Sequence, residues 1–145
     1  MVSALRSSQL SQPSRAAIRF PFFTQRPTED GCGAYVLQML TGMPLSDLET
    51  MIGWEAGELR RSVWPDLIRV LGALGWEIGA PLAVTSWDAV RGVAIVHVAE
   101  DHFMLYDADN AVFYDPWEWE GPAFACNRVP LSYLSVRPPN ADRAA

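Results

Sequence analysis

Residues 92–115, GVAIVHVAEDHFMLYDADNAVFYD, decide the fold class of this chain. The run Gly92–Ala99 is apolar at nearly every position, as is typical of a central β-strand that is buried on both faces. Two further β-rich runs, His102–Asp107 and Ala111–Asp115, are separated by Ala-Asp-Asn, which indicates a turn. The segment therefore predicts a central strand followed by an antiparallel hairpin, which ends at Pro116.

The residues before this segment carry a helical pattern. Residues 32–40, CGAYVLQML, are mostly apolar and are followed by Thr-Gly, which predicts a buried helix. Ser46 and Glu49 match a capping box and predict a second helix over residues 46–52. Apolar residues at helical spacing predict a third helix over residues 62–75, with a serine cap at its start and a glycine at its end.

The order of these elements, helices first and an antiparallel sheet afterwards, predicts an α+β fold. We expect a single domain over residues 20–136, a flexible N-terminal arm over residues 1–19 and a flexible tail over residues 137–145. Shorter pieces complete the pattern: a loop over residues 54–61, an extended piece over 76–78, a helical turn over 86–91 and a last strand over 131–136.

Composition excludes several classes of function. The chain has 145 residues and a formal net charge of −6, which disfavours binding to the phosphate backbone of nucleic acids. Its apolar runs fall far short of the roughly 20 residues that cross a bilayer, and its N-terminus lacks the apolar segment of a secretory signal. Two cysteines fit a reducing compartment. We therefore expect a cytoplasmic protein that binds neither nucleic acid nor membrane.

No cofactor or metal is expected either. The two histidines and two cysteines would suffice in number for a zinc site, but they do not follow the Cys-x-x-Cys or His-x-x-x-His spacing of such sites. The sequence also lacks a glycine-rich phosphate-binding loop.

Cys32 lies between Gly31 and Gly33 at the predicted start of the first helix. Backbone N–H groups and the positive end of the helix dipole favour a thiolate at such a position. The two glycines would let a substrate backbone approach closely, and Gly31 could adopt the dihedral angles of a tight turn. A small buried core residue is the alternative interpretation of Cys32. Cys126 is expected to be a buried residue without a chemical role.

A nucleophilic cysteine needs a base, and the chain has two histidines. His97 lies inside the apolar central strand, which indicates a buried and hydrogen-bonded core residue. His102 begins the hairpin, where the rim of the sheet can bring its ring to the start of a packed helix. With a turn centred near Asp109, Asp115 falls almost opposite His102 and could orient its ring. Asp115-Pro116 is otherwise a plain turn.

Gln25 could add a side-chain amide to an oxyanion hole if its loop folds back over the helix start. Gln25, Gly31-Cys32-Gly33, His102-Phe and Asp115-Pro, in this order, resemble the papain-like cysteine peptidases of the bacteriocin-processing (double-glycine leader peptidase) type. The resemblance extends over residues 20–120 and implies a papain-like fold, with the nucleophile at a helix N-terminus packed on a C-terminal antiparallel sheet.

The resemblance also implies a role for each of these residues. Cys32 would be the nucleophile, His102 the general base and acid, Asp115 the residue that orients it, and Gln25 with the Cys32 amide the oxyanion hole. The chain departs from the family in two respects. Gln25 lies seven residues before Cys32, one more than the commonest spacing, and Gly31 replaces the usual residue before the cysteine.

Trp117 and Trp119 alternate with glutamates directly after Asp115-Pro116. Aromatic and acidic residues beside a cleft would suit an apolar or cationic side chain of a substrate. A strand with its tryptophans facing inward is the alternative interpretation.

These observations favour a papain-like thiol hydrolase, a cysteine peptidase or amidase that forms a covalent acyl-enzyme on a peptide or isopeptide bond. Its partner would be a peptide or protein substrate. A second interpretation is a catalytically inactive domain, for example phage-encoded, that binds a protein through the same cleft. A third is a structural or inhibitory protein in which the constellation is coincidental. The sequence leaves the substrate, acyl transfer as against hydrolysis, and the oligomeric state open.

Overall fold

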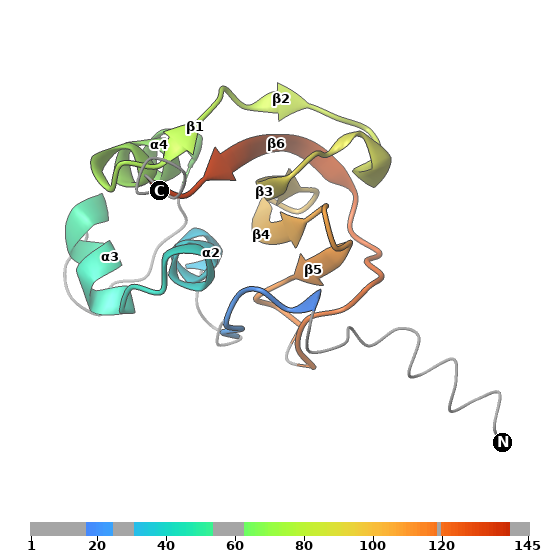
Figure 1. The fold of residues 1–145 in the computed structure, drawn as a ribbon, viewed down its shortest axis with the longest axis horizontal. Coiled ribbons are helices and arrows are strands. Elements are labelled where there is room, and N and C mark those ends of the chain that lie inside the picture. The colour runs from blue at the N-terminus through green and yellow to red at the C-terminus, as the bar shows by residue number, and fades with distance from the viewer. Residues whose placement is uncertain (1–16, 25–30, 54–62, 119, 140–145) are drawn as a thin grey trace, which may run out of the picture.

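The computed structural model describes residues 17–24, 31–53, 63–118 and 120–139 of the chain. In these residues, helices on one side of the molecule pack against a curved sheet (Figure 1). The helices are α2 (Cys32–Thr41), α3 (Leu45–Ile52) and α4 (Trp64–Ala73). The strands are β1 (Glu77–Ile78), β2 (Leu82–Ala83), β3 (Val93–Val98), β4 (His102–Asp107), β5 (Val112–Tyr114) and β6 (Pro130–Arg137), with a 3-10 turn, η2 (Trp87–Ala89), before β3.

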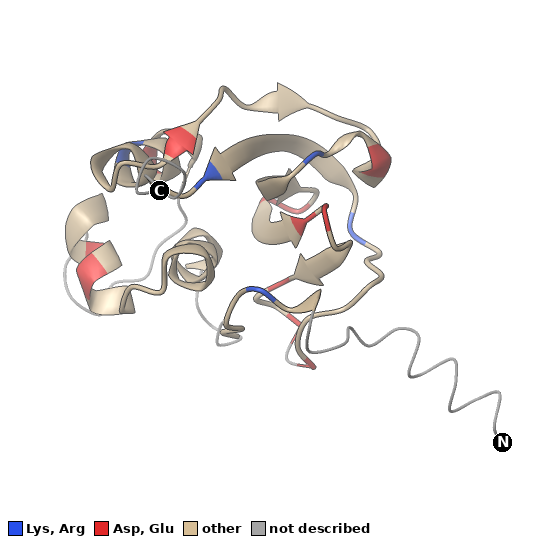
Figure 2. Ribbon diagram, in the orientation of Figure 1, with Lys and Arg blue, Asp and Glu red and all other residues tan. Residues whose placement is uncertain are grey.

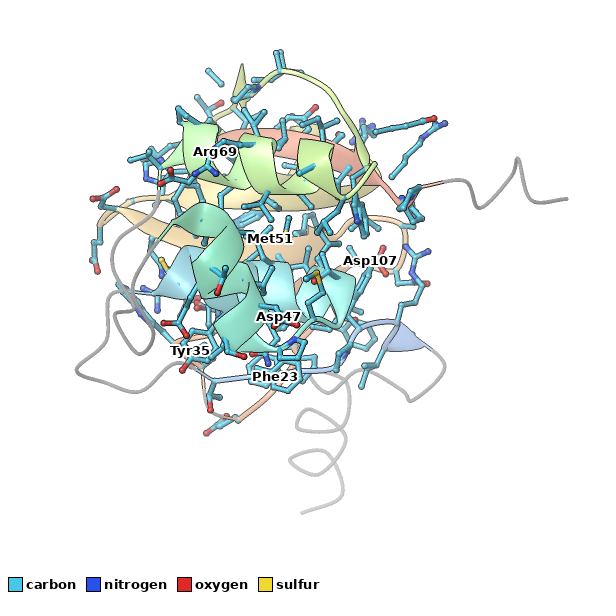
Figure 3. The ribbon with its side chains drawn as sticks, turned by 90° about the vertical axis from the view of Figure 1, so that its left-hand side faces the viewer. Phe23, Tyr35, Asp47, Met51, Arg69 and Asp107 are labelled. Atoms are coloured by element: carbon cyan, nitrogen blue, oxygen red, sulfur yellow. The ribbon has the colours of Figure 1, made fainter. Side chains whose placement is uncertain are left out.

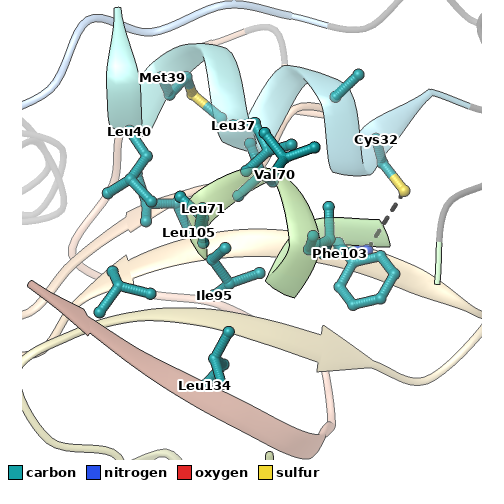
Figure 4. Packing of buried hydrophobic residues seen from close by; sticks show 14 of the residues in the cluster. Cys32, Leu37, Met39, Leu40, Val70, Leu71, Ile95, Phe103, Leu105 and Leu134 are labelled. Atoms are coloured by element: carbon teal, nitrogen blue, oxygen red, sulfur yellow. Dashed lines mark hydrogen bonds between the residues drawn. The ribbon is translucent and has the colours of Figure 1, made fainter. Parts of the chain in front are cut away.

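The sheet is antiparallel throughout and has the strand order β1-β6-β3-β4-β5, with β2 also paired to β6. Strand β3 therefore lies between β6 and β4, and the predicted central strand is confirmed. Ile95, Leu105 and Leu134 are neighbours across β3, β4 and β6 and are fully buried under the helices (Figure 4). The α+β fold predicted from the order of elements is confirmed as well.

The register of the β4–β5 hairpin differs from the prediction. Leu105 pairs with Tyr114, so the same register, continued to the end of β4, places His102 opposite Trp117 rather than opposite Asp115. A shift of two residues keeps every side chain on its face of the sheet, because the side-chain period of a strand is two. Asp115 and His102 thus remain on one face as diagonal neighbours.

The helices begin close to their predicted positions, but two caps differ. The amides of Asp47 and Leu48 both donate to the Pro44 carbonyl, so α3 starts before Ser46 and the serine does not cap it. Helix α4 begins after Val63, whose amide donates to the Asp66 carboxylate. The predicted cap at Ser62, like the loop over residues 54–61, lies outside the described residues.

Long-range contacts tie the helices together. The Arg69 guanidinium of α4 donates to the carbonyl oxygens of Met51 and Ile52 at the end of α3, at 2.8 and 2.9 Å (Figure 3). A cation at a helix C-terminus satisfies carbonyl groups that have no partner within the helix and complements the helix dipole. This contact fastens the end of α3 to α4. Figure 1 shows α2, α3 and α4 together on one side of the molecule.

Both predicted flexible termini need a corrected boundary. Arg19, which the sequence places in the arm, donates from Nε to the buried Asp107 carboxylate at 2.8 Å, and its amide donates to the Tyr114 hydroxyl at 3.1 Å. Arg137, which the sequence places in the tail, is the last residue of β6. Residues 1–16 and 140–145 lie outside the described part of the chain.

The Arg19–Asp107 pair provides a test of how the N-terminal segment contributes to stability. Burial raises the pKa of Asp107, but the hydrogen bonds from Arg19 and Asn110 outweigh it, so the pKa is lowered. Arg19→Ala leaves a buried carboxylate with a weaker set of donors. We expect it to reduce the free energy of unfolding by about 1–3 kcal/mol at pH 7, measured by urea denaturation.

The pH dependence of this effect follows from the sign of the shift. A group with a lowered pKa in the folded state adds stability above its unfolded pKa and loses it as the pH falls toward the folded value. The difference between wild type and Arg19→Ala should therefore shrink below about pH 4. Asp109→Asn is the control, because that Arg19 partner is exposed. Equal free energies of unfolding for Arg19→Ala and wild type at pH 7 would show that the Arg19–Asp107 contact does not stabilise the protein.

Candidate active site

Cys32 is the first residue of α2 and is 3% exposed. Its sulfur lies 3.4 Å from the amide nitrogen of Phe103, the second residue of β4, which donates a hydrogen bond to it (Figure 4). Gly31 caps the helix with φ −89° and ψ 29°, a conformation open to other residues, so it does not use the special dihedral angles that a glycine could adopt there. Gly33 is buried in the first turn of α2. The packing of α2 on β4 thus places the thiol at the start of β4.

The environment of Cys32 acts on its pKa in two opposing ways. Burial raises the pKa of the thiol, while the backbone amides of Phe103, Gly33 and Cys32 itself lower it. The net shift is upward, because desolvation is the largest effect. Burial therefore opposes the thiolate that the backbone amides at the helix start favour.

His102 and Asp115 form a buried pair at the start of β4, where His102 precedes in the chain the Phe103 amide that contacts the sulfur. Nε2 of His102 lies 2.6 Å from Oδ1 of Asp115, and the two residues are 0% and 3% exposed. Because an ionised carboxylate only accepts, Nε2 carries the proton of this hydrogen bond and Nδ1 is left with its lone pair. Nδ1 is buried and has no hydrogen-bond partner in the described part of the protein. The Phe103 amide that contacts Cys32 is the next backbone nitrogen after His102.

Asp115 accepts hydrogen bonds at both carboxylate oxygens. Oδ1 accepts from His102 and from the amide of Trp117 at 2.9 Å, and Oδ2 accepts from Nε of Arg128 at 2.7 Å. Burial raises the pKa of Asp115, but His102, Arg128 and the Trp117 amide together lower it below its usual value. Asp115 is therefore an ionised, fully bonded carboxylate at neutral pH.

Trp117 covers the His102 ring. The two rings stack with centroids 3.7 Å apart and an angle of 17° between their planes. Residues 116–118 form a turn after β5, so the interpretation of this stretch as a strand is wrong. An indole ring over the His102–Asp115 hydrogen bond keeps solvent from competing for it. Trp119, predicted to bind substrate together with Trp117, lies outside the described residues.

The second histidine takes a different place. His97 of β3 is only partly buried, and its Nε2 lies 3.1 Å from the Asp101 carboxylate in the turn before β4. The prediction of a buried core histidine is wrong, because His97 stands near the end of β3 where the sheet meets solvent. Its ring packs on Phe103, with centroids 4.9 Å apart. The structure therefore brings His102, and not His97, together with Asp115.

Two further residues singled out in the sequence are Gln25 and Cys126. Gln25 lies outside the described residues, so its predicted place in the oxyanion hole stays a prediction. Cys126 is partly buried rather than fully buried, and its sulfur accepts a hydrogen bond from the amide of Arg128 at 3.3 Å. Burial raises the pKa of the Cys126 thiol.

Arg128 is the contact to Asp115 that sequence reasoning missed. It follows Asp115 by 13 residues in an irregular segment between β5 and β6, with no motif or periodicity around it. A single arginine in such a segment is normally read as a solvated surface residue. The pairing therefore depends on tertiary structure that the local sequence does not encode.

The described residues contain no group of three or more His, Cys, Asp or Glu side chains placed to hold a metal ion. None of their helices has the length and apolar character needed to cross a membrane. Figure 2 shows the arginines of this part of the chain on several different segments.

Comparison with solved structures identifies the fold. A double-glycine motif protease from an AMS/PCAT transporter, solved in complex with the leader peptide, has a TM-score of 0.59 and 17% sequence identity, over 83% of this chain and 92% of that one. The peptidase domain of Streptococcus ComA, a bi-functional ABC transporter involved in a quorum-sensing pathway, has a TM-score of 0.58 and 15% identity, over 80% and 96%.

No protein-family model and no curated protein matches the sequence. The similarity to the two peptidases therefore lies in the fold, over most of this chain and nearly all of theirs. The chain has the α+β papain-like fold of these two peptidase domains, as its sequence motifs implied.

Proposed function

We propose that the protein is a papain-like cysteine peptidase that cleaves a peptide bond through a covalent acyl-enzyme. One observation carries this proposal above the others. His102 is buried with Nε2 bonded to Asp115 and with Nδ1 unpartnered in the described structure, while the Cys32 sulfur contacts the amide next to it. A histidine held by a carboxylate, with its other nitrogen free and the next backbone amide bonded to a thiol, supports nucleophilic catalysis.

In the proposed reaction the Cys32 thiol transfers its proton to Nδ1 of His102 as the sulfur attacks the substrate carbonyl. The C–S bond forms, and the carbonyl oxygen becomes an oxyanion that the Cys32 amide at the start of α2 can stabilise. His102 then returns the proton to the leaving amine as the C–N bond breaks, which leaves a thioester. Water, deprotonated by His102, attacks this thioester, releases the acid and restores the thiol.

The charge of Asp115 supports the proton-transfer steps. His102 becomes an imidazolium when it takes the thiol proton, and the ionised carboxylate at Nε2 stabilises that cation. Because burial alone raises the pKa of Cys32, the sulfur is a weak nucleophile until His102 acts. The His102–Asp115 pair therefore supplies the base that removes the thiol proton of Cys32, which the start of α2 does not provide by itself.

The substrate class follows from the fold comparison. One structural neighbour was solved with a leader peptide bound, which supports a peptide as the substrate of this chain too. The alternative, an inactive domain that binds a protein partner, has no observation in its favour that distinguishes it, since the buried His102–Asp115 pair would then have no chemical use.

A peptide with a C-terminal vinyl sulfone tests the proposal directly. An active cysteine peptidase forms a stable thioether with this electrophile, and intact-mass spectrometry followed by peptide mapping locates it. We expect one adduct on Cys32 and none on Cys126, whose neighbours include no histidine hydrogen bond among the described contacts. Equal modification of the two cysteines, or modification of neither, would argue for the inactive alternative.

A matched pair of histidine variants tests the role of His102. We expect His102→Gln to slow alkylation of Cys32 by iodoacetamide about 100-fold at pH 7, because the raised pKa of the buried thiol then leaves little thiolate. The small reagent is chosen because Cys32 is 3% exposed. The difference from wild type should shrink as the pH rises toward the raised pKa of the Cys32 thiol, because the thiol then ionises without a base.

His97→Gln is the control for these measurements, because Nε2 of His97 is bonded to Asp101 and not to Asp115. It should retain the wild-type alkylation rate. A loss of alkylation in His97→Gln with none in His102→Gln would reverse the assignment of the base.

A further inference from the structure

Arg128 contacts both of the groups that contact His102. Its Nε donates to Oδ2 of Asp115 at 2.7 Å, on the carboxylate oxygen that His102 does not use. Its guanidinium carbon lies 4.8 Å from the centre of the Trp117 ring, the same ring that stacks on His102. The guanidinium therefore fixes the plane of the carboxylate and packs on the indole.

The Asp115 carboxylate needs the Arg128 guanidinium as a partner because it borders a cavity. A cavity of about 530 Å³ borders Asp115 and Arg128, with Phe113, Glu118, Pro122 and Ala123 among its lining residues. Asp115 itself is only 3% exposed, so Oδ2 is directed at the guanidinium rather than at the space around it. Without Arg128, the carboxylate could turn toward the cavity and away from His102.

The backbone of Arg128 is itself held in place. Its carbonyl accepts a hydrogen bond from the indole Nε1 of Trp87 at 2.9 Å, and Trp87 packs edge-to-face on Tyr106 of β4 and Phe113 of β5. The side chain is 22% exposed, and its NH2 group lies 3.7 Å from the Glu118 carboxylate. Arg128 thus connects the irregular segment between β5 and β6 to the sheet that carries His102.

We propose that Arg128 is a positioning residue, which holds the Asp115 carboxylate in the arrangement that keeps the His102 ring fixed with Nδ1 free. This inference rests on the proposed function, because it concerns how the base of that reaction is oriented. Arg128 acts through Asp115 and makes no contact with the Cys32 thiol among the described interactions. Loss of the guanidinium should therefore slow the reaction of Cys32 only when residue 115 is an aspartate.

A double-mutant cycle on the full chain tests this coupling. The readout is the rate of iodoacetamide alkylation of Cys32 at pH 7, separated from that of Cys126 by peptide mapping. Arg128→Gln, which keeps a polar side chain but is shorter and loses the charge and the fork, should slow alkylation of Cys32 about tenfold in an otherwise wild-type chain. In an Asp115→Asn background the same change should have less than about a twofold effect, because the carboxylate it positions is gone.

Two controls separate positioning from a general loss of structure. Arg91→Gln removes an exposed arginine whose bonds go to the backbone carbonyls of Asp88 and Val90, and it should leave the rate unchanged. Melting temperatures are compared for all variants. Should Arg128→Gln not fold, Arg128→Lys keeps the charge without the fork and enters the same cycle.

The outcomes are distinguishable from failure of the proposed function. If Cys32 of the wild type is alkylated no faster than Cys126, the proposed function fails before any variant is compared. If Cys32 is activated but Arg128→Gln has the wild-type rate, or slows Cys32 equally in both backgrounds, the positioning role is overturned. A tenfold effect that disappears with Asp115→Asn supports it.

Discussion

Cys32→Ser and Cys32→Ala are both expected to lose hydrolysis of an activated ester such as N-acetylglycyl p-nitrophenyl ester, by about 10⁴-fold or more. The loss follows because the sulfur forms the bond to the acyl group, and no other group beside His102 replaces it. Serine is a weaker nucleophile whose pKa lies far above that of a thiol, so its oxygen does not substitute at neutral pH. An activated ester is used because its leaving group needs no proton.

The two variants should differ in stability although both are inactive. The Phe103 amide is buried and donates to the Cys32 sulfur. Serine retains an acceptor for this amide, whereas alanine leaves it unpartnered, at a cost of about 1 kcal/mol or more. Urea denaturation of the two proteins measures this difference. Stability therefore reports on the hydrogen bond, and ester turnover reports on the nucleophile.

Cys126→Ser is the matched control for these variants, since it alters the other thiol of the chain and keeps an acceptor for the Arg128 amide. It should hydrolyse the ester at the wild-type rate. Turnover that survives in Cys32→Ser and Cys32→Ala, or that disappears in Cys126→Ser, would show that Cys32 is not the nucleophile.

Local sequence was sufficient to predict the elements that carry the site. Cys32 follows a polar loop and opens an apolar run, and a buried helix begins at that residue in the structure. His102 starts a run of alternating β-formers and begins β4. Both positions follow from hydrophobic pattern and chain breaks, which are properties of a few neighbouring residues. The fold class follows because it depends only on the order of such elements.

The hairpin register was not predictable in the same way. The sequence places the turn around Asp109, but Asp107 pairs with Val112, and Ala111 closes the turn with φ 55°. Sequence rules assign a left-handed position to glycine or asparagine rather than to alanine. Asn110 instead uses its side chain to donate to the Asp107 carboxylate. The resulting turn moves the pairing by two residues and places Trp117 over His102.

Contacts between distant segments were missed for a related reason. Arg128 and Asp115 are separated by an irregular segment, and the choice of Asp115 as a partner depends on where Trp87 and the sheet hold the arginine. His97 was assigned to the core because its strand is apolar, although its own side chain faces Asp101. The hydrophobic pattern locates a strand, but it does not show which end of the strand is exposed to solvent.

Asp115→Asn and Asp115→Ala are expected to lower ester turnover by different amounts, about 100-fold for asparagine and about 10⁴-fold for alanine. Asparagine can still accept the Nε2 proton of His102 through Oδ1. Its amide nitrogen would then face Nε of Arg128, so two donors would meet where the wild type has a 2.7 Å ion pair. Asparagine therefore keeps the orientation of His102 in part, whereas alanine keeps none of it.

Stability separates the orienting role of Asp115 from a structural one. The pKa of Asp115 is lowered in the folded state, so wild-type stability should fall as the pH drops below about 4, and Asp115→Asn should lose that component. Turnover and melting temperature are measured together at pH 7 for the three proteins. Full turnover in both variants would make Asp115 a turn residue only. Unfolding of both would show that its role is structural, and the proposed reaction would then depend on Cys32 and His102 alone.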